Sequence, residues 1–138
     1  MSFREKSAWI TLLTVLACFG AYYGSILAGV VSPRGLDTLH LLLLCVIALA
    51  ALQLTLGVIA LLTTPKDERA PRDERERLIQ ARSHTLGYYV LIALVLALAI
   101  PGHTGHGVVD LMNFALLDVV LAVMVVAIAQ IVMFRRGA

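Results

Sequence analysis

The stretch TPKDERAPRDERERLIQARSHTLGYY, which runs from Thr64 to Tyr89, is the only long polar passage in this chain. It separates two pairs of apolar segments and carries most of the charged residues. The whole sequence is 60% hydrophobic and 14% charged, against about 45–50% and about 25% in soluble domains. The composition therefore predicts that the segments on both sides of the stretch lie in a lipid bilayer.

Four apolar segments are long enough to be membrane helices, since about 20 apolar residues cross the hydrocarbon core. The predicted spans are approximately residues 7–31, 39–63, 83–101 and 108–134 of a single domain, 1–138. Two short turns rich in Pro and Gly, Ser32–Gly35 and Pro101–Gly107, join the spans within each pair. The pattern predicts an all-α, up-down-up-down four-helix bundle.

The polar stretch itself has helix-forming features. Pro71 suits a first-turn position, and Asp73 and Arg77 stand four residues apart, a spacing that stabilises helices. We therefore expect a charged helix, about residues 71–84, that continues into the third span.

The positive charges predict the orientation. Of the eleven Lys and Arg residues, ten fall on one side of the four-span arrangement and only Arg34 on the other. The ten are Arg4, Lys6, Lys66, Arg69, Arg72, Arg75, Arg77, Arg82, Arg135 and Arg136. Basic residues favour the cytoplasmic side, so we expect both termini inside the cell and both short turns outside.

Small residues recur at four-residue spacing in the first span, at Gly20, Gly24 and Ala28. This spacing places them on one helix face and lets another helix backbone approach closely. The partner helix can belong to the same chain or to a second copy in a homodimer.

Polar side chains from all four spans are expected at nearly one depth in the membrane. The members of this layer are Tyr22, Tyr23, Gln53, Tyr88, Tyr89 and Asp118. An intramembrane carboxyl group is normally turned inward and paired or protonated. The layer can be a proton- or ligand-binding site, or a hydrogen-bond network that fixes the helix register.

Three histidines and a carboxylate, His40, His103, His106 and Asp110, gather near the predicted outer turns. Imidazole and carboxylate groups suit transition metals, but loop histidines without a site are the alternative. Haem can bind in helical bundles, yet no two histidines are expected at one depth on facing helices. We predict no cofactor.

The charged helix offers a docking surface for a cytoplasmic protein, with Asp73, Glu74, Arg77 and Ile79 as its candidate residues. The alternative is a solvated extension that only fixes the orientation. The net charge of +2 is too small to indicate direct binding of nucleic acid.

The segment DERERLIQARSHTLGYYVL, Asp73 to Leu91, resembles a signature of small, uncharacterised bacterial membrane proteins with four spans. In that family a D-E-R-x-x-x-I helix enters the third span from the cytoplasm. The resemblance implies a location in the bacterial inner membrane. Members are often encoded beside small helix-turn-helix regulators, which implies a role in sensing or sequestration, and the resemblance assigns no catalytic residue.

The sequence contains no phosphate-binding loop, dinucleotide fingerprint, nucleophile elbow or zinc-protease motif. We expect a non-enzymatic regulatory, sensor or accessory protein that binds lipid around it and a cytoplasmic partner. One alternative is a small oligomeric proton-coupled exporter that uses Asp118, and another is a metal-binding protein of the outer face. The small multidrug exporters are similar in length and span number, but they carry their carboxylate in the first span, where this chain has none.

Overall fold

The computed structural model describes residues 3–65 and 73–136, and they form helices connected by short turns. The helices are α1 (Phe3–Leu27), α2 (Leu36–Thr63), α3 (Glu74–Ala97), α4 (Ala99–His103) and α5 (Val108–Arg136). Four membrane-length helices result, because α3 and α4 together form one long apolar run, and each of the four can cross a bilayer. The predicted all-α fold is confirmed: this is a multi-pass membrane protein, with four membrane-length helices in the described residues.

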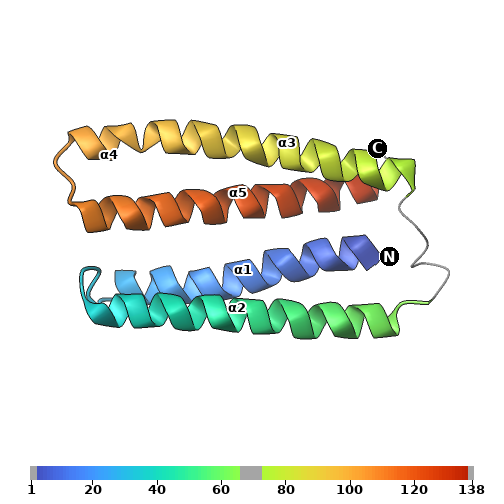
Figure 1. Ribbon diagram of the computed structural model, residues 1–138, viewed down its shortest axis with the longest axis horizontal. Helices are drawn as coiled ribbons and strands as arrows, with labels where there is room; N and C mark the ends of the chain where they lie inside the picture. Colours follow the sequence, from blue (N-terminus) through green and yellow to red (C-terminus); the bar gives the residue numbers. More distant parts are fainter. Residues whose placement is uncertain (1–2, 66–72, 137–138) are drawn as a thin grey trace.

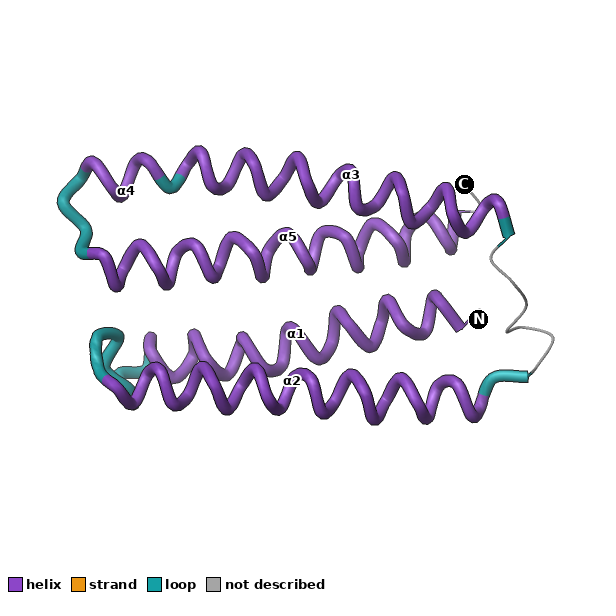
Figure 2. The backbone as a smooth tube through the Cα atoms, viewed as in Figure 1, coloured by secondary structure: helices purple, strands orange, loops and turns teal. Residues whose placement is uncertain are grey.

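The four long helices run up and down in alternation, so both ends of the described chain lie together (Figure 1). We call this end, which holds Phe3, Thr63, Glu74 and Arg136, the charged end. The opposite end holds residues 28–35 and 104–107 and is called the turn end (Figure 2). Pro71 and the predicted start of the charged helix lie outside the described residues, as do Lys66, Arg69 and Arg72.

The helices are arranged in the order α2, α1, α5, α3 across the molecule (Figure 1). α2 packs along α1, α1 along α5, and α3 along α5, whereas no comparable packing joins α2 to α3 in the described part of the chain. The most apolar windows of α1 and α5 are each 28% buried, against 6% for α2 and for the α3–α4 run. Two helical hairpins therefore meet through their inner helices, and the outer helices present most of their surface to lipid.

The first helix ends earlier than predicted. Gly29 adopts a left-handed backbone conformation with φ of 72°, which suits glycine because it has no Cβ. The amide of Val30 donates to the carbonyl of Ser25, and the amide of Gly29 donates to Ile26, the pattern of a Schellman helix end. The predicted boundary at residue 31 is therefore wrong, and Ala28 lies just beyond the helix.

The third span extends further than predicted. A break at Leu98 separates α3 from α4, three residues before Pro101. Pro101 has no amide hydrogen to donate to the preceding turn, and the helix resumes and continues to His103. Pro101 to His103 are therefore helical rather than part of the predicted turn, which shrinks to residues 104–107.

Small residues allow α3 and α5 to approach closely. A Cβ atom placed on Gly87 would lie 2.2 Å from Cγ2 of Val126 and 3.5 Å from the carbonyl oxygen of Ala122. Ser83, one turn before Gly87, is completely buried at the same contact. On the other side of α5, larger residues of α1, α2 and α5 form a separate core around Phe19 and Tyr22.

Candidate functional site

Tyrosines of α1 bind an asparagine of α5 in the half of the molecule nearer the turn end. The Tyr22 hydroxyl donates to Oδ1 of Asn113 at 2.8 Å, and the Tyr23 hydroxyl donates to the carbonyl oxygen of Asn113 at 2.9 Å. Tyr22 is 1% exposed. Two residues of the predicted polar layer therefore meet at Asn113, which the sequence analysis did not identify.

The carboxyl group of Asp118 is buried, with the residue 9% exposed. Its Oδ2 atom accepts no hydrogen bond from any residue that the structure describes. The group lies within electrostatic range of the Tyr23 hydroxyl. Asp118 is thus an internal carboxyl group near the predicted layer, with hydrogen-bonding capacity that the described chain leaves unused.

Gln53 takes part in a different contact. Its Nε2 atom donates to Oγ1 of Thr14 at 3.4 Å, which links α2 to α1. The Thr14 hydroxyl in turn donates to the carbonyl oxygen of Ile10. Gln53 therefore contributes to hairpin packing, and the described residues show no hydrogen bond between Gln53 and Asp118.

Tyr88 and Tyr89 do not join the polar layer in the structure. They are 61% and 64% exposed on the outside of α3, and their rings contact each other edge to face. Gly87 turns toward α5 and is buried, so the next two side chains rotate away by about 100° and 200° at 3.6 residues per turn. The depth predicted for Tyr88 and Tyr89 along the helix axis did not specify which side of α3 they face.

A lateral groove lies between α1 and α5 in the half nearer the turn end. Its volume is about 780 Å³. Its walls are mainly apolar and include Phe19 and Gly20 of α1 and Phe114, Leu117 and Met124 of α5. Four polar side chains also line the groove, those of Tyr23, His106, Asp110 and Asn113.

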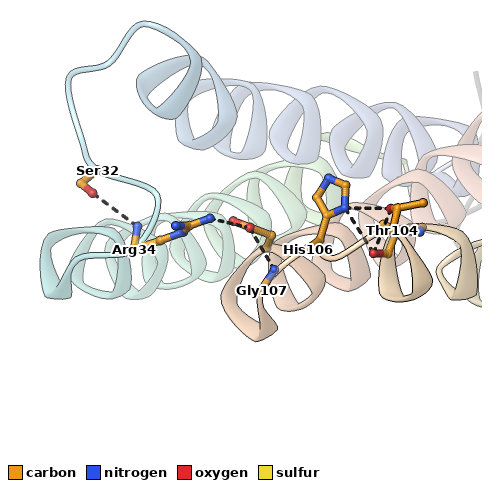
Figure 3. Close-up of polar contacts among 7 residues, drawn as sticks. Ser32, Arg34, Thr104, His106 and Gly107 are labelled. Atoms are coloured by element: carbon orange, nitrogen blue, oxygen red, sulfur yellow. Dashed lines mark hydrogen bonds and ion pairs between the residues drawn. The ribbon is translucent and has the colours of Figure 1, made fainter.

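An ion pair joins the two hairpins at the turn end. Nη2 of Arg34, in the first turn, lies 2.8 Å from Oδ2 of Asp110 in α5, and the Gly107 amide donates to the same oxygen (Figure 3). The hydrogen bond to Asp110 raises the pKa of the Arg34 guanidinium, which is already charged at neutral pH. The pair lies beside the groove, because Asp110 and Pro33 both line it.

The predicted metal ligands either bond to other groups or lie apart from one another. Nδ1 of His103 contacts the Ala99 carbonyl, and Nδ1 of His106 contacts the Thr104 hydroxyl (Figure 3). Within residues 3–65 and 73–136, no group of three or more His, Cys, Asp or Glu side chains is placed to hold a metal ion. His40, His103, His106 and Asp110 therefore do not assemble as a common site, because Asp110 pairs with Arg34 and each of the two turn histidines bonds locally.

The candidate docking residues separate into two groups at the charged end. Asp73 caps α3 by accepting from the amide of Glu74, and Glu74 and Arg77 are exposed. Ile79 is only 2% exposed, so it is part of the core rather than of a docking surface. Leu78, which is exposed, is the apolar side chain beside Glu74 and Arg77.

Several contacts fasten this part of α3 to α1 and α5. Arg4 pairs with Glu76 at 2.5 Å, and Nε2 of Gln130 donates to the Ser83 hydroxyl at 3.2 Å. These residues surround or adjoin a polar cavity of about 270 Å³ that Arg4, Glu76 and Gln130 line. Ser83 and Gln130 were not among the residues predicted from the sequence, although a glutamine within an apolar run is itself a signal of an interior partner.

The small residues of α1 do not pack against another helix of the chain. A Cβ atom added to Gly20 or to Gly24 would meet no described atom within 4 Å, and Ala28 is exposed. Their predicted packing within the chain is therefore not found, and packing against a second copy remains a prediction.

Comparisons of the chain with protein-family models, with curated proteins and with solved structures find no match.

Proposed function

We propose that the protein is a non-enzymatic regulatory or accessory protein of the bacterial inner membrane, which docks a cytoplasmic protein on the exposed side of α3. The single observation that carries the proposal is the division of the first turns of α3 into a fastened face and a free-standing face. Ile79 and Glu76 attach the helix to the protein, whereas Glu74, Arg77 and Leu78 are directed outward.

A rigid surface favours binding because little conformational entropy is lost when a partner docks. The attachment of α3 through Ser83 and Gln130 supplies such rigidity. Charged residues of both signs around an apolar side chain then give complementarity and orientation. The partner is expected to carry an apolar pocket flanked by residues of both charges.

Crosslinking in intact cells tests the docking surface. A photocrosslinking amino acid replaces Leu78 in one variant and Leu96, an exposed apolar residue further along α3, in a control. We expect one protein adduct at position 78 that disappears when Glu74→Arg and Arg77→Glu are added. Adducts of equal yield at both positions, or an adduct at 78 that survives the charge reversal, would contradict the docking surface.

The orientation has a separate test. Cys18 and Cys45 are both buried, so cysteines introduced at exposed positions can be labelled over a low background. A thiol reagent that does not cross the inner membrane should label Thr104→Cys in cells with a permeable outer membrane, and Glu74→Cys only after lysis. Labelling in the reverse order would place the charged end outside.

A second candidate, a proton-coupled transporter, is favoured by the buried carboxyl group of Asp118. Its Oδ2 atom is without a hydrogen-bond partner in the described chain. The polar cavity at the charged end shares Gln130 with a second cavity of about 490 Å³. That second cavity reaches Ala122, one helical turn, or about 6 Å, from Asp118.

Proton flux distinguishes this candidate from the first. Vesicles that contain the protein are loaded with candidate lipophilic substrates, and internal pH is followed. A transporter should show substrate-dependent flux that Asp118→Asn abolishes and that Asp37→Asn, a change at an exposed carboxylate, leaves intact. Equal flux in both variants and in protein-free vesicles would exclude transport through Asp118.

A further inference from the structure

The lateral groove opens sideways from the layer of helices. Leu16, Leu27 and Leu121 line it and are exposed on the outer surface. In a bilayer this opening faces lipid, and chains of neighbouring lipids can enter without passing through water. From Asp110 to Met124 the groove follows α5 for about 21 Å at 1.5 Å per residue. This exceeds half of the roughly 30 Å hydrocarbon core, so an acyl chain of one leaflet fits along it.

Apolar lining alone does not select an occupant, because acyl chains gain no hydrophobic energy by leaving other acyl chains. Selectivity must come from polar groups. Asn113 uses its Oδ1 and its backbone carbonyl for the two tyrosines, whereas its amide nitrogen donates no hydrogen bond to any described residue. Asn113 lines the groove about 4.5 Å deeper than Asp110, at a level where its amide nitrogen can donate to a lipid ester carbonyl.

The rim of the groove carries a charge of each sign. Arg34 is 67% exposed and uses one nitrogen for Asp110, so further guanidinium N–H groups remain to bind a phosphate. Asp110 accepts from Arg34 and Gly107 through Oδ2, and its Oδ1 accepts from no described residue. A head group that carries both a phosphate and a primary ammonium matches this pair, since each charge then meets its opposite.

We infer that the lateral groove binds one glycerophospholipid with a zwitterionic, primary-ammonium head group. Its acyl chain lies between Phe19 and Leu117, its ester carbonyl accepts from Asn113, and its head group spans Arg34 and Asp110. The groove is distant from the docking surface on α3, so this assignment does not depend on the proposed function.

The test uses the full-length protein reconstituted with equal amounts of phosphatidylethanolamine, phosphatidylcholine and phosphatidylglycerol. Lipid retained after detergent extraction is counted per chain by native mass spectrometry. We expect one retained phosphatidylethanolamine, favoured over phosphatidylcholine by about fivefold, the contribution of roughly one charged contact at a membrane surface. Preference for phosphatidylglycerol would overturn the head-group assignment.

Two glycine substitutions on α1 provide a matched pair. Gly20 lines the groove and Gly24 does not. At both positions an added Cβ meets no described atom within 4 Å, and Leu favours a helix more than Gly does. Gly20→Leu should lower lipid retention about tenfold, equivalent to about 1.4 kcal/mol, while Gly24→Leu leaves it unchanged. Arg34→Gln should abolish the head-group preference without displacing the chain.

The other possible occupants give different results. Equal lipid retention in Gly20→Leu and Gly24→Leu would show that the retained lipid lies elsewhere. A dimer that both substitutions dissociate, with no retained lipid in the native protein, would show that a second copy fills the groove. Displacement of the lipid by a lipophilic amine at equimolar concentration would identify an amine site. Each of these outcomes overturns the lipid assignment.

Discussion

The two halves of the molecule are packed in different ways. Near the charged end, α1, α3 and α5 are joined by the Arg4–Glu76 pair and the Ser83–Gln130 hydrogen bond, and Ile79 is buried among them. Near the turn end, α1 and α5 enclose a groove, and α4 has no buried residue. The protein thus combines a fastened half with a half that has room for a ligand.

Side-chain size explains this difference. Close contact in the fastened half uses Gly87, Ser83 and Ala122, and small residues let helix backbones approach in a membrane, where packing rather than water exclusion holds helices together. In the open half, aromatic residues of α1 and α5, Phe19, Tyr23 and Phe114, lie along the groove. Substitutions can therefore be chosen that affect one half and leave the other unchanged.

The largest effect is expected from Gly87→Leu. The new side chain would overlap Val126, whose Cγ2 lies 2.2 Å from the position of a Cβ, and overpacking costs about 1–3 kcal/mol. Thermal unfolding in detergent measures the loss. Gly57→Leu on α2 is the control, because nothing lies within 4 Å of a Cβ there. Equal unfolding temperatures for the two variants would show that α3 and α5 are not in close contact.

The next effect is expected at the link between α1 and α5. Asn113→Leu leaves the buried Tyr22 hydroxyl without its acceptor, and an interhelical hydrogen bond in a membrane contributes about 0.6–2 kcal/mol. A double-mutant cycle with Tyr22→Phe should give a coupling energy in this range, measured by chemical unfolding. Additive effects of the two substitutions would mean that no hydrogen bond joins the residues.

A smaller effect is expected from Glu76→Gln. The pair with Arg4 is partly exposed, so its loss should lower the free energy of unfolding by about 0.2–1 kcal/mol, and less in high salt. Arg34→Gln removes the pair at the turn end, where Arg34 is more exposed, and should have a smaller effect. A reversed order would show that the turn end is the more firmly held half.

The smallest effect is expected from Tyr88→Phe and Tyr89→Phe. Both residues are on the outer surface of α3, so removal of either hydroxyl should change the free energy of unfolding by less than about 0.5 kcal/mol. The same change at Tyr22 provides the contrast. A loss at Tyr88 or Tyr89 similar to that at Tyr22 would place these hydroxyls inside an assembly of several chains.

The number of long helices, their order and their up-and-down alternation were predictable. Each depends on local properties of the sequence, namely the length of the apolar segments and the turns between them. Rotation of a helix about its axis was not predictable. The number of residues between each turn and the side chain predicted that Tyr88 lies at the depth of Asp118. Gly87, however, determines which face of α3 meets α5. Asn113 was overlooked for the same reason, since its partners depend on how α1 faces α5.

Pairing of the inner helices also affects when the fold can be completed. Tyr22 and Asn113 are 91 residues apart in the chain, and ribosomes add about 5–20 residues per second. α1 therefore remains in the membrane without its α5 partner for at least about 5 s of synthesis. Once α2 is complete at Thr63, the α1–α2 hairpin persists for the rest of this interval with the face that later packs on α5 still uncovered. Folding is thus expected to end with the docking of two hairpins, at a rate set by their encounter within the bilayer.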